Sequence, residues 1–200
     1  MKLIMVRHGE TAWNQQKKIQ GVSDIGLNER GIEQVQKLAL SLRNEKIEAI
    51  VTSPLKRAYD TALAIGRFHD VEIHVEDDLH ELNTGDLEGL TFPEVLARYP
   101  SFIREWRTDH ASPVLPNGES LVELQNRAWT VIKRIIANPK NTVVVSHNFA
   151  LAAILCRIQN LDISHVTRMH VGMASKTVVD IENGNAVVSS FNQTDHLNDV

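Results

Sequence analysis

Three apolar runs in this chain each lead into a side chain that could bind or attack a phosphoryl group. They are residues 3–6 ahead of His8, residues 49–51 ahead of Arg57, and residues 143–145 ahead of His147. If the runs are neighbouring strands of one parallel sheet, these side chains face the same crevice, because open α/β sheets place their chemistry at the carboxyl ends of strands. The pattern therefore predicts one site built from three distant parts of the sequence.

Phosphoryl transfer needs an in-line nucleophile, cationic or N–H donors around the phosphoryl oxygens, and an acid for the leaving oxygen. A neutral imidazole such as that of His8 can attack phosphorus if its other ring nitrogen donates a hydrogen bond. Arg7, Arg57 and His147 could then surround the phosphate. Glu81 is the expected proton donor, because a carboxyl group in a partly desolvated crevice can keep its proton near neutral pH.

Helical spacing predicts the elements that position the first of these groups. Residues 28–44 carry an apolar stripe, with Asn28 available as the N-cap. A second helix is expected to begin at Ser53, which could cap it, with Pro54 in its first position. Arg57 would then lie in the first turn of that helix.

The rest of the chain predicts a sheet of mixed direction and a cover over the crevice. Residues 71–75 alternate like a half-exposed strand at a sheet edge, and Glu81 lies in the loop that follows. Residues 91–117 are weakly patterned and predict a lid. The later elements begin with a helix that starts after a Ser120/Glu123 capping box and stops before Pro139. They continue with a strand over 142–145, a helix over 149–158, and strands over 176–181 and 186–190 joined by Asn183-Gly184.

These elements predict an α/β fold with three layers, α/β/α, around a mostly parallel sheet with an antiparallel edge. The chain has 200 residues, which favours a single domain over 1–200 that includes the lid at 91–117. The sequence does not specify an oligomeric state, and a homodimer would be the commonest one.

Composition excludes several classes of function. The formal net charge is −4 and the basic residues are dispersed, so no nucleic-acid partner is expected. No apolar stretch is long enough to span a bilayer, and the amino terminus has no features of a signal peptide, so we expect a cytoplasmic protein without a membrane partner. Cys156 is the only cysteine and is expected to pack in the core.

The histidines do not predict a metal site. There are nine, but the pairs His69/His74 and His165/His170 lack the spacing that places two imidazoles on one helical face. The single cysteine of the sequence cannot supply the missing metal ligands. We therefore expect neither a metal nor another cofactor, and we expect His110, His165, His170 and His196 at the surface or in the lid, with His196 near the pocket. Trp13 and Trp129 are expected to pack rather than bind substrate.

Several motifs together resemble the signature of the histidine phosphatase (phosphoglycerate mutase-like) superfamily. They are Arg7-His8-Gly9-Glu10-Thr11 with Trp13-Asn14; Gln20-Gly21 with Asp24, Leu27 and Gly31; Ser53-Pro54 with Arg57-Ala58 and Thr61-Ala62; Leu79, Glu81, Gly85 and Glu88-Gly89; and Ser146-His147. The resemblance spans nearly the whole chain and implies a phosphoglycerate mutase-like fold without a metal. It implies His8 as the phosphorylated nucleophile, Glu81 as the proton donor, and a phosphate pocket. That pocket comprises Arg7, Arg57 and His147, helped by Asn14, Gln20 and Gly21, and we include Gly9 and Asn148, which follow the two histidines.

Within the superfamily the chain is most similar to compact phosphomonoesterases, which include phosphoserine and α-ribazole phosphatases. The segment 89–145 is shorter than in the mutases, and the tail 192–197 resembles a closing motif of the phosphatases. Asn148 stands where glycine is more usual, and Gly26 where many members have proline. The leading hypothesis is a metal-independent phosphomonoester hydrolase that acts on small phosphorylated metabolites through phosphohistidine.

Two alternatives stay open at this point. A phosphoglycerate mutase would return the phosphoryl group to a second hydroxyl instead of to water. A non-catalytic phosphate-binding module is the less favoured alternative, because His8 and Glu81 are both intact. The physiological substrate is not specified, since the lid is the least patterned part of the chain.

Overall fold

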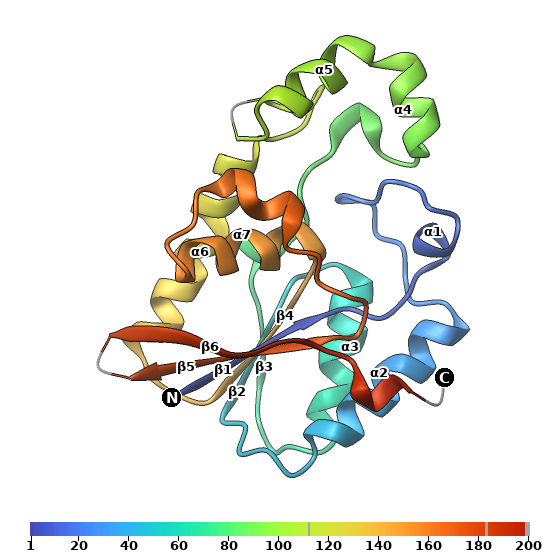
Figure 1. Cartoon of the computed structure of the whole chain (residues 1–200). Coiled ribbons are helices and arrows are strands. Elements are labelled where there is room, and N and C mark those ends of the chain that lie inside the picture. Colours follow the sequence, from blue (N-terminus) through green and yellow to red (C-terminus); the bar gives the residue numbers. More distant parts are fainter. Residues whose placement is uncertain (112, 183, 199–200) are drawn as a thin grey trace.

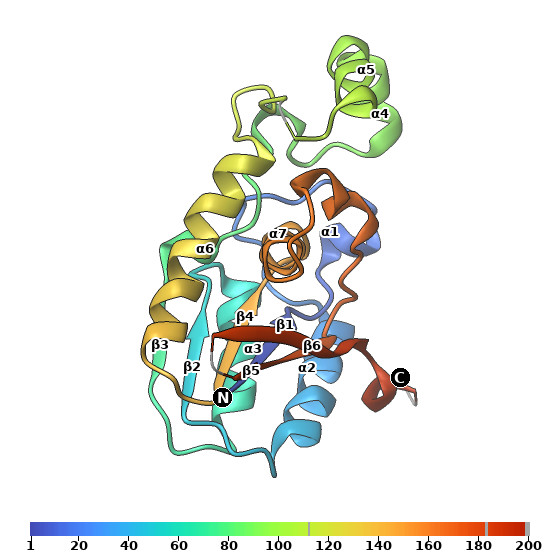
Figure 2. The same cartoon turned by 60° about the vertical axis from the view of Figure 1, so that its left-hand side comes forward.

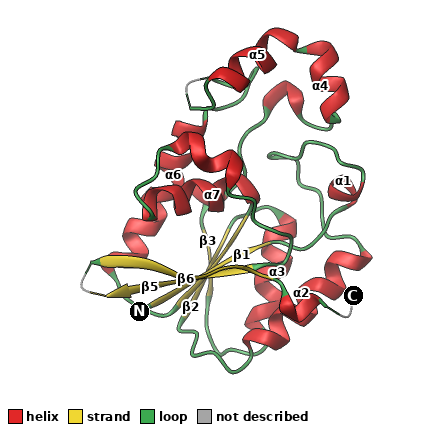
Figure 3. Ribbon diagram, viewed as in Figure 1, coloured by secondary structure: helices red, strands yellow, loops and turns green. Residues whose placement is uncertain are grey.

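A six-stranded mixed sheet forms the centre of the computed structural model, which describes residues 1–111, 113–182 and 184–198. The strands are β1 (Lys2–Arg7), β2 (Ala49–Thr52), β3 (Ile73–Val75), β4 (Thr142–Ser146), β5 (Lys176–Glu182) and β6 (Asn185–Gln193), in the order β3-β2-β4-β1-β5-β6. The first four run parallel, β5 is antiparallel to β1, and β6 is antiparallel to β5. Figure 3 shows these strands in yellow among the red helices. The predicted mostly parallel sheet with an antiparallel edge is confirmed.

Seven α-helices are found among the described residues. They are α1 (Ala12–Gln15), α2 (Glu29–Leu42), α3 (Lys56–Gly66), α4 (Phe92–Arg98), α5 (Pro100–Thr108), α6 (Leu121–Ala137) and α7 (Asn148–Ile158). Short 3-10 turns are η1 (Asp77–Leu79), η2 (Gly85–Leu87), η3 (Ile163–Arg168) and η4 (Asp195–Leu197).

The side chains of the central strands point alternately to the two faces of the sheet, and helices cover both faces, which gives three layers. Leu3 and Met5 of β1 pack with α6 and α7, whereas Ile4 and Val6 pack with α2 and α3. Successive strand residues point to opposite faces, so the two helix pairs cover opposite faces of the sheet (Figures 1 and 2). Cys156 of α7 is fully buried in the core, as predicted.

The second helix begins later than the sequence predicted. α3 starts at Lys56 rather than at Ser53, so Pro54 precedes the helix and Leu55 is its N-cap. Ser53 does not cap it, because its Oγ accepts from the Leu55 N–H inside the preceding loop and also pairs with His147. Arg57 still lies in the first turn, as predicted.

The other predicted elements differ mainly at their ends. Asn28 caps α2 by accepting from the Gly31 N–H, and β3 is an edge strand that is shorter than the predicted 71–75. The β5–β6 hairpin is present, with Glu182 paired to Asn185; Asn183 of the predicted turn lies outside the described residues. No helix in the described ranges is long and apolar enough to cross a membrane.

The predicted lid contains two short helices. α4 and α5 stand apart from the sheet, beyond the carboxyl ends of the parallel strands (Figure 1). Tyr99 ends α4 and precedes α5, which starts at Pro100. Val95 and Ile103 anchor these helices in a third apolar cluster that includes residues of α6 and α7.

Candidate active site

His8 and His147 lie at the carboxyl ends of adjacent parallel strands. His8 follows β1 and His147 follows β4, and the two strands pair with Arg7 opposite Ser146. The His8 N–H donates to the Ser146 carbonyl at 3.2 Å, and the two imidazole centroids are 5.1 Å apart. Both histidines are buried. The structure thus brings the two predicted histidines together.

One hydrogen bond holds His8 in a single tautomer. Its Nδ1 lies 2.7 Å from the Gly9 carbonyl oxygen, and a carbonyl can only accept, so the proton is on Nδ1 and Nε2 keeps its lone pair. The pKa of His8 lies well below its usual value, because burial and the charges of Arg57 and Arg7 disfavour the imidazolium. His8 is therefore a neutral imidazole, the form that can attack phosphorus.

Arg57 is fully buried and supported by backbone carbonyls from a distant loop. Its guanidinium donates to Gly21 O at 2.7 Å and to Ser23 O at 2.8 Å. Burial lowers the pKa of Arg57 to about 10, so the group remains charged at neutral pH. The two carbonyls compensate for a cation in the first turn of a helix, where the helix dipole is unfavourable.

Gly21 fixes the loop that holds Arg57. The N–H groups of Gly21 and Ser23 both donate to Glu88 Oε1, at 3.0 and 2.6 Å. A Cβ on Gly21 would stand 2.6 Å from Thr84 Oγ1 and 2.7 Å from the Leu82 carbonyl oxygen, so only glycine fits there. Sequence reasoning missed this role of Glu88, although Glu88-Gly89 was among the matching motifs.

Arg7 and Asn148 meet at the backbone of Val171. Arg7 NH1 donates to the Val171 carbonyl at 2.5 Å, and Asn148 Oδ1 accepts from the Val171 N–H at 3.0 Å. Burial lowers the pKa of Arg7, while the charge of Glu81 opposes that shift. Asn148, predicted to bind phosphate, thus has its carbonyl oxygen engaged with the loop that supports Arg7.

The Glu81 carboxyl group lies at the amino end of α7. It accepts from Leu82 N–H at 2.9 Å and from the N–H groups of Phe149 and Ala150 at 3.2 Å each. Burial nevertheless raises the pKa of Glu81, and the effect exceeds the opposing influence of Leu82, Phe149 and the two arginines of the site. A buried carboxyl group with a raised pKa is suited to donate a proton.

His147 presents one nitrogen to the protein and leaves the other without a partner. Its Nε2 lies 2.8 Å from Ser53 Oγ, whereas Nδ1 is buried without a hydrogen bond to any described residue. The pKa of His147 lies well below its usual value because of burial first, then Arg57 and His8. Ser53 was expected to cap a helix, so its contact with His147 was not predicted.

Asn14 and Gln20 direct their carbonyl oxygens toward Thr11. Asn14 Oδ1 accepts from the Thr11 N–H at 3.1 Å, and Gln20 Oε1 lies 2.7 Å from Thr11 Oγ1. Their amide NH₂ groups therefore remain as donors. Thr11 is completely buried and was not predicted as part of the site.

Four buried nitrogen atoms of the predicted site have no hydrogen-bond partner among the described residues. They are Arg7 Nε, Gln20 Nε2, Arg57 Nε and His147 Nδ1. Buried donors normally find an acceptor. These four groups come from separate segments, and each is an N–H donor of the kind that binds phosphoryl oxygens.

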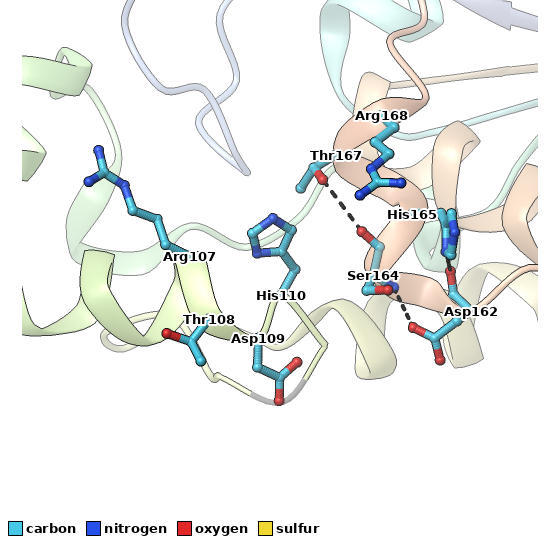
Figure 4. Close-up of a pocket in the computed structure, with 9 residues that line it drawn as sticks. All are labelled: Arg107, Thr108, Asp109, His110, Asp162, Ser164, His165, Thr167 and Arg168. Atoms are coloured by element: carbon cyan, nitrogen blue, oxygen red, sulfur yellow. Dashed lines mark hydrogen bonds between the residues drawn. The ribbon is translucent and has the colours of Figure 1, made fainter.

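A second, polar pocket of about 400 Å³ lies between the end of α5 and η3 (Figure 4). Of the described residues, its walls include Arg107, Thr108, Asp109, His110, Asp162, Ser164, His165, Thr167 and Arg168. None of these nine belongs to the predicted phosphate site. Figure 4 shows Arg107 and Arg168 on opposite sides of the pocket.

Comparison with known proteins agrees with this arrangement. The model of the histidine phosphatase superfamily (branch 1) matches residues 3–194. The chain is 35% identical over 199 residues to phosphoserine phosphatase 1 of Hydrogenobacter thermophilus, which covers 98% of this chain and 94% of that protein. The chain therefore belongs to the histidine phosphatase superfamily.

Solved structures give the same result. The phosphoserine phosphatase of Entamoeba histolytica in complex with 3-phosphoglyceric acid superposes with a TM-score of 0.87 at 31% identity, covering 98% of each chain. The α-ribazole phosphatase of Shigella flexneri gives a TM-score of 0.89 at 25% identity, covering 97% of each chain. The predicted family and activity are confirmed: the protein is a phosphomonoester hydrolase of the histidine phosphatase superfamily.

Proposed function

We propose that this phosphatase works through a covalent phosphohistidine at His8 and needs no metal ion. The observation that carries the proposal is the 2.7 Å contact between His8 Nδ1 and the Gly9 carbonyl oxygen. This contact leaves Nε2 unprotonated, and the low pKa of His8 keeps the ring neutral. The backbone carbonyl of Gly9 thus orients the imidazole of His8 for attack.

In the first step, the Nε2 lone pair of His8 forms a bond to phosphorus while the ester P–O bond breaks. The leaving oxygen takes the proton of the Glu81 carboxyl group, which gives a neutral alcohol, a phosphohistidine and a Glu81 carboxylate. The raised pKa of Glu81 supports this role. A bound phosphate dianion would raise that pKa further, because a nearby negative charge disfavours the carboxylate.

The phosphoryl oxygens are held by the four buried donors described above. Arg7 and Arg57 supply fixed positive charge, and His147 and Gln20 supply neutral N–H donors, with the Asn14 amide beside them. Such preoriented donors stabilise the charge that develops on the phosphoryl oxygens in the transition state. Gly21 and Asn148 support this pocket by holding the loops behind Arg57 and Arg7.

In the second step, water attacks phosphorus and the N–P bond breaks. The Glu81 carboxylate takes a proton from that water, and the bonding electrons return to His8 Nε2. The products are inorganic phosphate and the starting enzyme. The cycle balances without a metal, and among the described residues no group of three or more His, Cys, Asp or Glu side chains could hold one.

A phosphate-release assay tests this function. Alkyl and aryl phosphomonoesters, phosphoserine and 3-phosphoglycerate would each be incubated with enzyme and excess EDTA. Release of inorganic phosphate that is insensitive to EDTA and lost in His8→Ala supports the proposal. Conversion of 3-phosphoglycerate to 2-phosphoglycerate without phosphate release would instead favour a mutase, and binding without turnover a non-catalytic module.

We also propose that the enzyme acts in the cytoplasm on a small-molecule substrate alone. The buried free thiol of Cys156, the only cysteine of the sequence, is compatible with a reducing compartment. Cell fractionation tests the location. Sedimentation of the purified protein tests the homodimer suggested above.

A further inference from the structure

An apolar cavity of about 270 Å³ lies beneath the lid helices. Its lining comes from α4 and α5, from the segment 82–87, from Ile19, from Leu115 ahead of α6, and from the first turn of α7. The lining residues are Ile19, Leu82, Thr84, Leu87, Phe92, Val95, Phe102, Ile103, Trp106, Leu115 and Phe149. Phe102 and Trp106 form a tilted aromatic pair with centroids 5.7 Å apart.

Two lining residues connect this cavity to the proposed proton donor. The N–H groups of Leu82 and Phe149 both donate to the Glu81 carboxyl group, at 2.9 and 3.2 Å, and the same two residues form part of the cavity wall. Glu81 therefore lies beside the cavity. Because the proton of Glu81 goes to the leaving oxygen in the proposed mechanism, a substituent on that oxygen starts next to the cavity wall and can extend into the cavity.

The chemistry of the wall selects what can enter. None of the described lining residues is charged, and the hydroxyl of Thr84 packs against Gly21. An ammonium or carboxylate placed there would lose its hydration without gaining a charged partner among the described lining residues. An aromatic or branched aliphatic group would instead exchange water for apolar contacts.

Charged groups are concentrated in the other pocket beside the lid. That pocket contains Arg107, Arg168 and two carboxylates and shares no lining residue with the apolar cavity. Trp106 lies at the boundary: it lines the apolar cavity, and His110 of the polar pocket stacks on its ring with centroids 5.5 Å apart. The lid thus separates an apolar from a polar environment.

We propose that the cavity beneath α4 and α5 receives the alcohol portion of the substrate, so that the enzyme prefers phosphomonoesters whose leaving group carries an aromatic or branched apolar portion. This inference rests on the proposed function, because the role of Glu81 orients the substrate. The proposed substrate preference differs from the one that the name of phosphoserine phosphatase 1 of Hydrogenobacter thermophilus gives for that relative.

The test compares ethyl phosphate, 2-phenylethyl phosphate and phosphoserine. All three release an alkoxide-type oxygen, so they need the proton of Glu81 to a similar degree. We expect kcat/KM for 2-phenylethyl phosphate to exceed that for each of the other two by roughly 10² or more, since each added methylene in an apolar pocket contributes about tenfold or more. Equal values, or a preference for phosphoserine, would overturn the inference.

Variants of the wall separate recognition from folding. Phe102→Ala and Trp106→Ala should bring the ratio of kcat/KM for 2-phenylethyl phosphate to that for ethyl phosphate at least tenfold closer to one, because the larger substrate loses more apolar contact. Phe68→Ala, at a half-exposed phenylalanine just after α3, is the matched control and should leave the ratio unchanged. An equal loss on both substrates in the lid variants would make the cavity purely structural and would overturn the proposal.

An inhibition measurement on the unaltered enzyme needs no variant. 2-Phenylethylphosphonate should inhibit at least tenfold more tightly than ethylphosphonate, and equal inhibition would contradict the cavity's role. Measuring whether either phosphate ester labels His8 distinguishes a failure of this inference from a failure of the proposed function. If His8 is labelled but the apolar preference is absent, only the inference fails; if His8 is never labelled, the proposed function fails.

Discussion

Ser53 Oγ and His147 Nε2 lie 2.8 Å apart, and this contact connects the end of β2 to the end of β4. Ser53 Oγ already accepts from the Leu55 N–H at 3.3 Å, so its own proton is available for Nε2. His147 is neutral because its pKa is strongly lowered. Donation by Ser53 therefore places the imidazole proton on Nδ1, the nitrogen assigned to the phosphoryl group.

Ser53→Ala should raise KM for small phosphomonoesters by roughly tenfold, the effect of losing one hydrogen bond of about 1.4 kcal/mol. Ser53 acts here as a positioning residue. The imidazole ¹⁵N shifts of His147 should show a change from the Nδ1–H tautomer toward a mixture. Ser146→Ala is the matched control, since Ser146 is equally buried but donates to the Leu79 carbonyl. The same KM change in both variants, with no tautomer change in Ser53→Ala, would refute the role.

Asn148→Gly should weaken phosphate binding through Arg7. Without the side-chain acceptor, Val171 N–H loses its partner and the carbonyl that accepts from Arg7 is less well fixed. We expect the inhibition constants of vanadate and inorganic phosphate to rise by roughly tenfold. Asn192→Gly, which removes the acceptor of the neighbouring Gly172 N–H, should have a smaller effect. Unchanged inhibition in Asn148→Gly would show that Asn148 does not support Arg7.

The sequence predicted those site residues whose proximity follows from the order of the strands in the sheet. His8 and His147 each follow an apolar run, and parallel pairing of β1 with β4 brings them together. The roles of Ser53 and Asn148 could not be predicted, because each depends on a contact made across the sheet or with a distant loop. For the same reason Ser53 was assigned to a helix that begins only at Lys56.

The hydrogen bonds from Arg57 to backbone carbonyls could not be predicted either. The sequence predicts its position in a helix's first turn, but its acceptors Gly21 and Ser23 lie more than thirty residues earlier. The cavity beneath the lid arises where α4 and α5 meet α7 and the segment after Glu81. No local period encodes such packing, so the sequence predicted a lid at 91–117 but not the apolar space beneath it.

Glu81→Gln should slow the cleavage of alkyl phosphates such as phosphoserine by roughly 10²–10⁴-fold, the usual contribution of a positioned acid. Phosphorylation of His8 by p-nitrophenyl phosphate should suffer much less, because nitrophenolate leaves without a proton. Single-turnover rates on the two substrates provide the comparison. An equal loss on both would reject the proton-donor role, and no loss on either would remove Glu81 from the mechanism.

Acid should destabilise the fold through the two buried histidines. Their folded pKa values lie well below 6.5, so the unfolded chain binds protons first as the pH falls. Their stabilising contribution is full above pH 6.5 and is lost below it, with a slope of up to about 1.4 kcal/mol per pH unit for each histidine. Glu81 has the opposite sign, because its folded pKa is raised and its contribution falls as the pH increases.

His8→Asn should therefore fold at pH 7 and lose less stability between pH 6 and pH 5 than the native protein does. Urea denaturation between pH 5 and pH 6 measures how the free energy of unfolding changes with pH in each protein. The two slopes should differ by nearly one proton taken up on unfolding. Identical slopes for His8→Asn and the native protein would show that His8 titrates normally in the folded state.

The most direct test of the account is to trap the covalent intermediate. The enzyme would be mixed with ³²P-labelled phosphomonoester, quenched within milliseconds and digested under alkaline conditions that preserve phosphohistidine. The account predicts label on His8, attached through Nε2, in the peptide that contains Arg7 and Gly9. Label on His147, or turnover that survives in His8→Ala, would contradict it.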